Sequence, residues 1–411
     1  MGQTVLPTTR AQVSGHRFLR RRVEHGLVLG DIRMIHDPLA ARSRALLFGV
    51  VAVVMISLGA GLLAWLRPAA HPGEAPILQT SGGALFVRVD DRVHPVTNLA
   101  SARLIAGGDE DPARIGDGVL AELERGVPVG IHPAPLVLGE SPVGETAWSV
   151  CADGDGVVTV TVGGIGDHTD PLGGHRGVLA TGAGADWLLT SAGRHRLPHP
   201  ESPEGRTVRR ALGVTPTTQR WEPPLEVLNA VTELDPVVLP EPPAEILDTG
   251  AGLWALLPAG VAPLTGVQAE VLESTGVPRR TVPREELAHH PDTPYDLRLP
   301  EFAPLFLDPR EVTVCATGGR VSTLVSQTRP VTLSGTGVAD EFRGGARTAL
   351  AVDTGHGHHV VDTTGLRHPV PERADLAALG LPDPVAAPWS VVRLLPEGPP
   401  LTREVALRAS Y

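Results

Sequence analysis

Two Asp-Thr-Gly triplets, at residues 248–250 and 353–355, come closest to a catalytic pattern in this chain. Aspartic proteases use one such triplet from each half of the molecule, so that two carboxylates share a proton. Here the Thr-Gly belongs to a repeat with four copies, and the second copy has Ala180 in place of Asp. Ala251 and His356 follow the triplets, where those proteases usually carry a hydroxyl, and both triplets fall in one half of the chain. We therefore expect turns in a repeat, not a catalytic pair.

Other polar groups resemble metal or nucleotide sites only in part. The histidines at 289–290 and 356–359 suggest metal binding, but no Cys or carboxylate lies at a ligand spacing beside them. The sequence DGDG at 153–156 starts like a calcium loop but lacks Glu at the twelfth position, which favours a hairpin turn. All 35 basic residues are Arg, which excludes the Lys of a Walker A phosphate loop. No metal, cofactor or catalytic residue is predicted.

An uncharged stretch from Ala45 to Leu66 must position everything that follows it. As a helix rising ~1.5 Å per residue it would be about 33 Å long, close to the hydrocarbon thickness of a bilayer. Arg42 and Arg44 precede the stretch, and Arg67-Pro68 end it. Trp65 occupies an interfacial position. The length favours a transmembrane helix; the alternatives are an uncleaved signal peptide and a buried core helix.

The charge of the chain is distributed unevenly around this stretch. Residues 1–44 contain more Arg than Asp and Glu, whereas the whole chain has a formal charge of −11, so the part after the stretch is strongly acidic. Positive flanks stay in the cytoplasm, which predicts a cytoplasmic N-terminus and an extracytoplasmic domain. An acidic domain argues against nucleic acid as a partner.

A basic amphipathic helix is predicted before the membrane stretch, from His16 to His36, with Ser14 as its N-cap. Leu19, Val23 and Leu27 fall on one face of it, and several Arg crowd its first turns. Such a helix suits either the surface of anionic lipid or a cytoplasmic protein partner. The composition does not decide between the two.

The acidic part contains an internal repeat. Each copy reads as an apolar strand, a glycine turn, a second strand and a short strand with Pro, and a helical stretch follows three of the copies. One such unit cannot bury its own apolar face, which accounts for several copies. Glycine in the turns supplies a positive φ for tight hairpins. The segments are 77–96, 178–198, 246–264 and 350–370; the helical stretches are 99–105, 268–272 and 373–379; the aligned threonines are Thr80, Thr181, Thr249 and Thr354; the turn glycines are Gly82, Gly83, Gly182, Gly184, Gly250, Gly252, Gly355 and Gly357.

The repeats fall into two related halves, each with a long insert. WSVCADG in the first insert matches VTVCATG in the second, so the two cysteines, Cys151 and Cys315, occupy equivalent positions. In an oxidising compartment, a disulfide across the pseudo-two-fold axis is the natural interpretation. The alternative is two free buried thiols.

These features predict a single-pass membrane protein with an α+β, mostly β ectodomain of four small strand-rich repeats around a central disulfide-linked core with pseudo-two-fold symmetry. The predicted parts are a cytoplasmic helix (1–44), a transmembrane helix (45–66) and an extracytoplasmic domain (67–411), in which the repeats are 76–107, 177–213, 245–276 and 349–381, the central core is 108–176 and 277–345, and the tail is 382–411.

Long blocks of the sequence resemble EccB, the membrane core component of type VII (ESX) secretion systems of actinobacteria. They are RAQVSGHRFLRRRVEHGLVLGDIRMIHDP before the membrane stretch, GALFVRVDDRVHPVTNLASARLIAG after it, the paired WSVCADG and VTVCATGG, and WSVVRLLPEGPPLTREVAL near the end. The resemblance covers nearly the whole chain. It implies a cytoplasmic helix, one membrane pass and an outer domain of four repeats around a disulfide-linked core.

The resemblance also implies partners and a function. The partners would be the EccC ATPase, the channel-like EccD, EccE where present, and the mycosin protease, within an oligomeric membrane complex. Peptidoglycan joins them because the family's repeats have been likened to cell-wall-binding modules. We expect a structural subunit that scaffolds channel and motor. The alternatives are a wall-binding or sensory protein acting alone and, from a label that family members often carry, an ATP hydrolase, for which this Lys-free chain shows no site.

Overall fold

The computed structural model describes residues 9–30, 32–33, 38–66, 73–139, 146–344 and 347–410. The side chains of residues 29, 38–43 and 64–66 fall outside that description. The predicted roles of Arg42, Trp65 and Arg67-Pro68 therefore lie outside the described residues. The chain divides into two compact units, residues 1–71 and 72–411.

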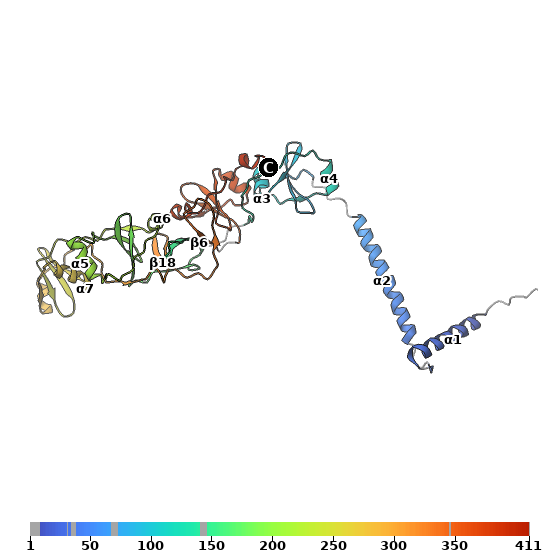
Figure 1. Ribbon diagram of the computed structural model, residues 1–411, viewed down its shortest axis with the longest axis horizontal. Helices are drawn as coiled ribbons and strands as arrows, with labels where there is room; N and C mark the ends of the chain where they lie inside the picture. The colour runs from blue at the N-terminus through green and yellow to red at the C-terminus, as the bar shows by residue number, and fades with distance from the viewer. Residues whose placement is uncertain are drawn as a thin grey trace, which may run out of the picture. The chain divides into compact units, whose positions relative to one another are not determined.

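The first unit contains two helices (Figure 1). α1 (Arg10–Leu29) starts earlier than predicted, because Thr9 and not Ser14 caps it. The Thr9 hydroxyl accepts a hydrogen bond from the Gln12 amide, and the Gln12 side chain accepts one from the Thr9 amide. Gly30, with φ at 67°, ends the helix in the left-handed conformation, so the predicted continuation beyond it is wrong.

α2 (Pro38–Leu66) is one continuous helix that includes the predicted membrane stretch. Within it, Arg44–Leu63 is the one segment among the described residues that is long and apolar enough to cross a membrane. The side chains of this segment are exposed, as expected of a helix that meets lipid instead of a protein core. A single-pass membrane protein is compatible with these features.

The second unit is a strand-rich mixture of α and β structure. Four small sheets, here named sheets I to IV in chain order, are each built on a three-stranded antiparallel meander. In sheets I, III and IV a fourth, short strand pairs in parallel with the first strand of the meander. Sheet I contains β1 (Ile77–Gln79), β2 (Leu85–Val89), β3 (Arg92–Val96) and β4 (Ala113–Arg114); sheet II contains β8 (Arg176–Gly182), β9 (Ala185–Thr190), β10 (Gly193–Arg196), β11 (Glu233–Leu234) and β16 (Leu305–Phe306); sheet III contains β12 (Glu245–Asp248), β13 (Leu253–Leu257), β14 (Gly260–Leu264) and β15 (Arg279–Thr281); sheet IV contains β21 (Leu350–Asp353), β22 (His358–Val361), β23 (Arg367–Val370) and β24 (Val385–Ala386).

A helix follows the meander of every small sheet. The helix after sheet II, α5, was not predicted; it begins after a longer loop, where Ser202 caps it and Pro203 takes the first helical position. The helices of the second unit are α3 (Leu99–Ala106), α4 (Asp117–Glu122), α5 (Pro203–Ala211), α6 (Leu225–Leu228), α7 (Gly266–Ser274), the 3₁₀ helix η1 (Arg284–His289), α8 (Arg373–Ala378), α9 (Trp389–Val392) and α10 (Arg403–Ala406).

Both inserts contribute to one central sheet of seven strands, in the order β19-β20-β6-β5-β17-β18-β7. The outer strands depart from two-fold symmetry, because β20 runs parallel to β6 whereas β7 runs antiparallel to β18. The strands are β5 (Thr146–Ala152), β6 (Val158–Gly164), β7 (Thr169–Pro171), β17 (Val314–Thr317), β18 (Arg320–Leu324), β19 (Val331–Thr332) and β20 (Glu341–Gly344).

The small sheets pack in pairs. Sheets I and IV share one apolar cluster, to which α3 and α8 contribute. α5 of sheet II packs against α7 of sheet III, and Figure 1 shows these helices together. The short helices α6 and α9 both pack on β5 of the central sheet. Helices that bury apolar faces between sheets thus supply the core that one small sheet cannot form alone.

Candidate functional site

Cys151 and Cys315 join the two inserts at the middle of the central sheet. They stand directly opposite each other on the antiparallel strands β5 and β17, with their Cα atoms 3.9 Å apart, and they form the predicted disulfide. Both residues are completely buried, which keeps the bond away from solvent thiols. The bond links positions separated by 164 residues, so it restricts the unfolded chain strongly.

The two faces of the central sheet differ in chemistry. Trp148 and Ala152 of β5 lie in the apolar cluster that includes residues of α6 and α9. The opposite face carries the disulfide and a set of buried hydroxyls. The Thr317 hydroxyl lies 2.7 Å from that of Ser149 and 2.7 Å from that of Ser322. Because these hydroxyls bond one another, the polar face is buried without unsatisfied groups at these positions.

The Asp-Thr-Gly triplets form turns. Oδ1 of Asp248 accepts a hydrogen bond of 2.8 Å from the Gly250 amide, and the Thr249 hydroxyl donates one of 3.1 Å to the Gly252 carbonyl. The triplet at Asp353 repeats both bonds, at 2.9 and 2.8 Å. Asp and Thr are thus used for the hydrogen bonds of a tight turn, which explains the recurrence of these residues in the sequence.

The two aspartates of the triplets belong to different sheets. Asp248 ends β12 of sheet III and Asp353 ends β21 of sheet IV. Oδ2 of Asp248 also lies 2.7 Å from Arg279. Hydrogen bonds from the Gly250 amide and from Arg279 lower the pKa of Asp248 below its usual value. An ionised carboxylate held by an Arg and a turn amide is unlike the shared-proton pair of a protease.

The turn glycines lie at the turn between the first two strands of their meanders, but only some have the predicted conformation. Gly83, Gly184, Gly250, Gly355 and Gly357 have a positive φ. The prediction is wrong for the other three turn glycines. In sheet II Ala183, with φ at 53°, takes a left-handed position next to Gly184. The glycines without a positive φ are Gly82, Gly182 and Gly252.

Two histidines of sheet IV stack on an aromatic ring. The rings of His356 and His359 stack on Trp389, with centroids 6.1 and 5.2 Å away, and the Arg367 guanidinium lies 5.2 Å from the same ring. Burial, followed by the charge of Arg367, lowers the pKa of His359. Across the described residues, no group of three or more His, Cys, Asp and Glu could hold a metal ion.

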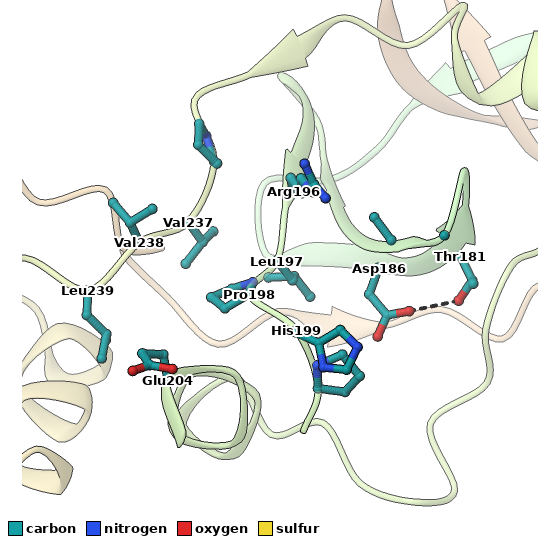
Figure 2. Close-up of a pocket in the computed structure, with 14 residues that line it drawn as sticks. Thr181, Asp186, Arg196, Leu197, Pro198, His199, Glu204, Val237, Val238 and Leu239 are labelled. Atoms are coloured by element: carbon teal, nitrogen blue, oxygen red, sulfur yellow. Dashed lines mark hydrogen bonds between the residues drawn. The ribbon is translucent and has the colours of Figure 1, made fainter. Parts of the chain in front are cut away.

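A pocket of about 590 Å³ opens in sheet II (Figure 2). It lies between the end of β10, the first turn of α5 and residues 236–239. Leu197 and Pro198 line its centre, and Figure 2 places Glu204 and His199 at its rim. Apolar side chains dominate the lining, as in small-molecule pockets generally.

Asp186 is a buried charged group on the wall of this pocket. Its carboxylate lies 2.7 Å from Arg209 and 2.8 Å from Arg220, and the Thr181 hydroxyl donates to it at 3.0 Å (Figure 2). Burial raises the pKa of Asp186, but the hydrogen bonds from Arg220, Arg209 and Thr181 outweigh burial and lower it. The ionised carboxylate is engaged by its own chain, which makes it a structural ion pair and not a free acid or base.

Three histidines at equivalent places in their meanders were missed as a pattern in the sequence. Each lies on the third strand and makes a 2.9 Å hydrogen bond through Nδ1 to a main-chain oxygen 31 to 40 residues further on. A carbonyl only accepts, so Nδ1 carries the proton. A signal existed, because VHP and RHP occur in the first and fourth repeats. The pairs are His94 with Val127, His195 with Asp235, and His368 with Pro399.

The apolar helix and the strand-rich unit with its joined inserts are compatible with a single-pass membrane protein. A family model described as "Type VII secretion system ESX-1, transport TM domain B" matches residues 5–250 and 333–410. The chain belongs to this family, the EccB family, which confirms the resemblance seen in the sequence.

Individual proteins are similar over nearly their whole length. ESX-1 secretion system ATPase EccB1 of Mycobacterium tuberculosis is 30% identical over 97% of this chain and 94% of its own. ESX-3 secretion system ATPase EccB3 of Mycolicibacterium smegmatis is 31% identical over 98% of this chain and 90% of its own. A chain of an intact ESX-5 inner membrane complex matches with a TM-score of 0.69 and 29% identity, covering 100% of this chain and 97% of the other. A chain of an EccB3 dimer from the ESX-3 core complex matches with a TM-score of 0.64 and 26% identity, covering 82% and 100%.

Proposed function

We propose that this chain is a structural core subunit of a type VII (ESX) secretion complex in an actinobacterial membrane. The observation that carries the proposal is the match to a chain of an intact ESX-5 inner membrane complex over 100% of the present sequence. α2 anchors the subunit, and the strand-rich unit braces the channel and motor subunits. EccC, EccD, EccE where present, and the mycosin protease are the proposed partners, in an oligomeric assembly.

The four small sheets are copies of one repeat in this proposal. The equal strand order of sheets I, III and IV supports it. A second similarity also supports it: the third strand of each meander pairs in parallel with a later segment of the chain. This pairing consists of isolated β-bridges in sheets I, III and IV and of the strand β11 beside β10 in sheet II. The repeats at 76–107, 177–213, 245–276 and 349–381 surround a core from 108–176 and 277–345, with a tail at 382–411. The pseudo-two-fold relation is proposed for the four middle strands of the central sheet alone.

The proposed orientation places residues 1–44 in the cytoplasm, a helix at 45–66 in the membrane and residues 67–411 outside. The excess of Arg before the apolar segment supports it. Ser14→Cys and Glu201→Cys, two exposed positions, test it in intact cells with a thiol reagent that does not cross membranes. Labelling of position 201 alone is expected. Labelling of position 14 alone would reverse the topology.

The experiment on function is secretion. Deletion of the gene should abolish export of the ESX substrates of the host, and the wild-type chain should restore it. A chain in which α2 is replaced by a cleavable signal peptide exports the same outer unit without an anchor and should fail to restore secretion. Secretion that persists in the deletion strain, with the other ESX subunits present, would contradict the proposal.

ATP hydrolysis is a second candidate only because the relatives carry the word ATPase in their names. The purified full chain, measured with and without an excess of EDTA, tests it. Turnover that depends on Mg²⁺, co-elutes with the chain and survives a further purification step would favour an enzyme.

A further inference from the structure

The last residues of the chain cross from sheet IV to sheet I. We name Leu401–Ser410 the C-terminal strap. It starts on sheet IV, where the Leu401 amide donates to the Pro369 carbonyl at 2.9 Å. It ends on the segment that follows sheet I, where Ala409 pairs in antiparallel fashion with Val129. The Ser410 amide donates at 2.9 Å to the carbonyl of the residue before Val129.

Side chains of the strap and of α3 close the carbonyl ends of two helices. Nε of Arg403 donates at 3.1 Å to the carbonyl of Ile105, in the last turn of α3. From α3, Nη1 of Arg103 donates at 3.0 Å to the carbonyl of Leu379, at the end of α8. The last carbonyls of a helix lack partners within it, and an Arg from elsewhere satisfies them. Arg403 thus connects the strap to α3, which follows sheet I, and Arg103 connects α3 to α8, which follows sheet IV.

The strap is held by few buried groups. Of its residues, only Leu401 and Ala406 are buried, and both lie in the apolar cluster shared by sheets I and IV. α10 is one short helical turn, and Arg403 and Arg408 are exposed. A segment with two buried side chains and one short helical turn makes few buried apolar contacts, so it belongs to the low-stability part of a structure, which opens locally before the core unfolds.

We propose that the C-terminal strap is a releasable latch that fixes sheet I against sheet IV. Sheet I is the first described sheet after α2 in the sequence, so the latch couples residues 401–410 to the sheet that follows the membrane helix along the chain. Closed, it holds the paired sheets in one arrangement. Open, it lets sheet I change its position relative to sheet IV, while the disulfide keeps the central sheet intact.

The latch makes a prediction for the unmodified full-length protein in detergent. Amide hydrogen exchange in residues 401–410 and at Gly130, whose amide donates to the Arg408 carbonyl, should be at least about tenfold faster than in β5 and β17. Equal protection of the strap and the central strands would mean that the strap opens only with global unfolding, and would overturn the proposal without any variant.

Variants test the coupling itself. Spin labels at Ser81→Cys in sheet I and Ala374→Cys on α8, both exposed positions, report the distance between the two sheets, because the native cysteines are bonded and do not react. Ala406→Asp, which puts a charge into the apolar cluster, should broaden the distance distribution and leave exchange in β5 unchanged. Arg408→Ala is the matched control: it removes only an exposed pair with Glu404 within the strap and should change nothing. An unchanged distribution in Ala406→Asp, or faster exchange throughout β5, would refute the latch.

Discussion

His368 donates a hydrogen bond of 2.9 Å through Nδ1 to the main-chain oxygen of Pro399, and its ring is completely buried. Its Nε2 atom is buried without a hydrogen-bond partner. Burial lowers the pKa of His368 below its ordinary value of 6.5, against smaller opposing contributions from the Pro399 bond and Asp362. The histidine thus links the third strand of sheet IV to the segment around Pro399, and burial favours its neutral form.

Because of His368, the protein should become less stable as the pH is lowered. Above pH 6.5 His368 is neutral in both states; below it the unfolded chain binds the proton and the folded chain does not, so the free energy of unfolding decreases as pH falls toward the folded pKa. His368→Asn keeps a donor but does not titrate. The free energy of unfolding, measured with denaturant at several pH values between 7 and 5, should change less with pH in this variant than in the wild type. Equal slopes would assign the pH dependence to other groups.

Loss of the disulfide should loosen the central sheet first. Cys151→Ser should lower the free energy of unfolding by roughly 2–5 kcal/mol, the usual range for a native bridge. Each small sheet keeps its own meander, so we expect exchange protection to drop in β5 and β17 before it drops in the sheets. On a denaturing gel the oxidised outer unit should migrate faster than the reduced one.

Thiol titration gives the direct control for the bridge. Protein purified from the native membrane and unfolded without reductant should expose no reactive thiol. Two thiols per chain would remove the bridge and the account of the central sheet with it.

The ion pair on the pocket wall should matter more than its surface counterparts. Asp186→Ala leaves the buried Arg209, whose side chain is 9% exposed, without its carboxylate. Removing one partner of a buried pair costs roughly 3–5 kcal/mol, measurable by denaturant unfolding. Asp296→Ala, which breaks the exposed pair with Arg298, is the matched control and should have little effect. Comparable losses in both variants would show that Asp186 is not held as the structure indicates.

The triplet aspartates should be dispensable for function. Asp248→Asn and Asp353→Asn retain the side-chain oxygen that accepts from the turn amide, so folding and secretion should stay near wild-type levels. Secretion assays beside a measurement of protein level separate function from folding. Loss of secretion at normal level and assembly would revive the catalytic interpretation.

Local patterns predicted local elements well. Apolar runs broken by glycine turns indicated strands at 77–96 and 350–370, where the structure has meanders, and an uncharged run indicated the long helix α2. The helix α5 and the true start of α1 were missed although both carried cap signals, Ser202-Pro203 and Thr9 with Gln12. Cap residues of these types also occur in turns, so they do not mark a helix by themselves.

Long-range contacts were predictable only where the repeat aligned them. The matching inserts predicted the pairing of Cys151 with Cys315, because the two cysteines occupy the same position in the similar segments WSVCADG and VTVCATG. Nothing comparable marks Asp186, Arg209 and Arg220 as partners, since an ion pair depends on how α5 and the loop after it return to sheet II. The same holds for Arg403 and Ile105, 298 positions apart.

Purification of the chain from its native membranes in mild detergent, followed by identification of the membrane proteins that accompany it, tests the central claim most directly. The account predicts a large assembly in which this chain and the other membrane subunits of one ESX system occur in fixed proportion. The chain should be present in that assembly with its Ala45–Leu66 membrane helix intact. A chain that elutes alone, while the other ESX subunits assemble without it, would contradict the account.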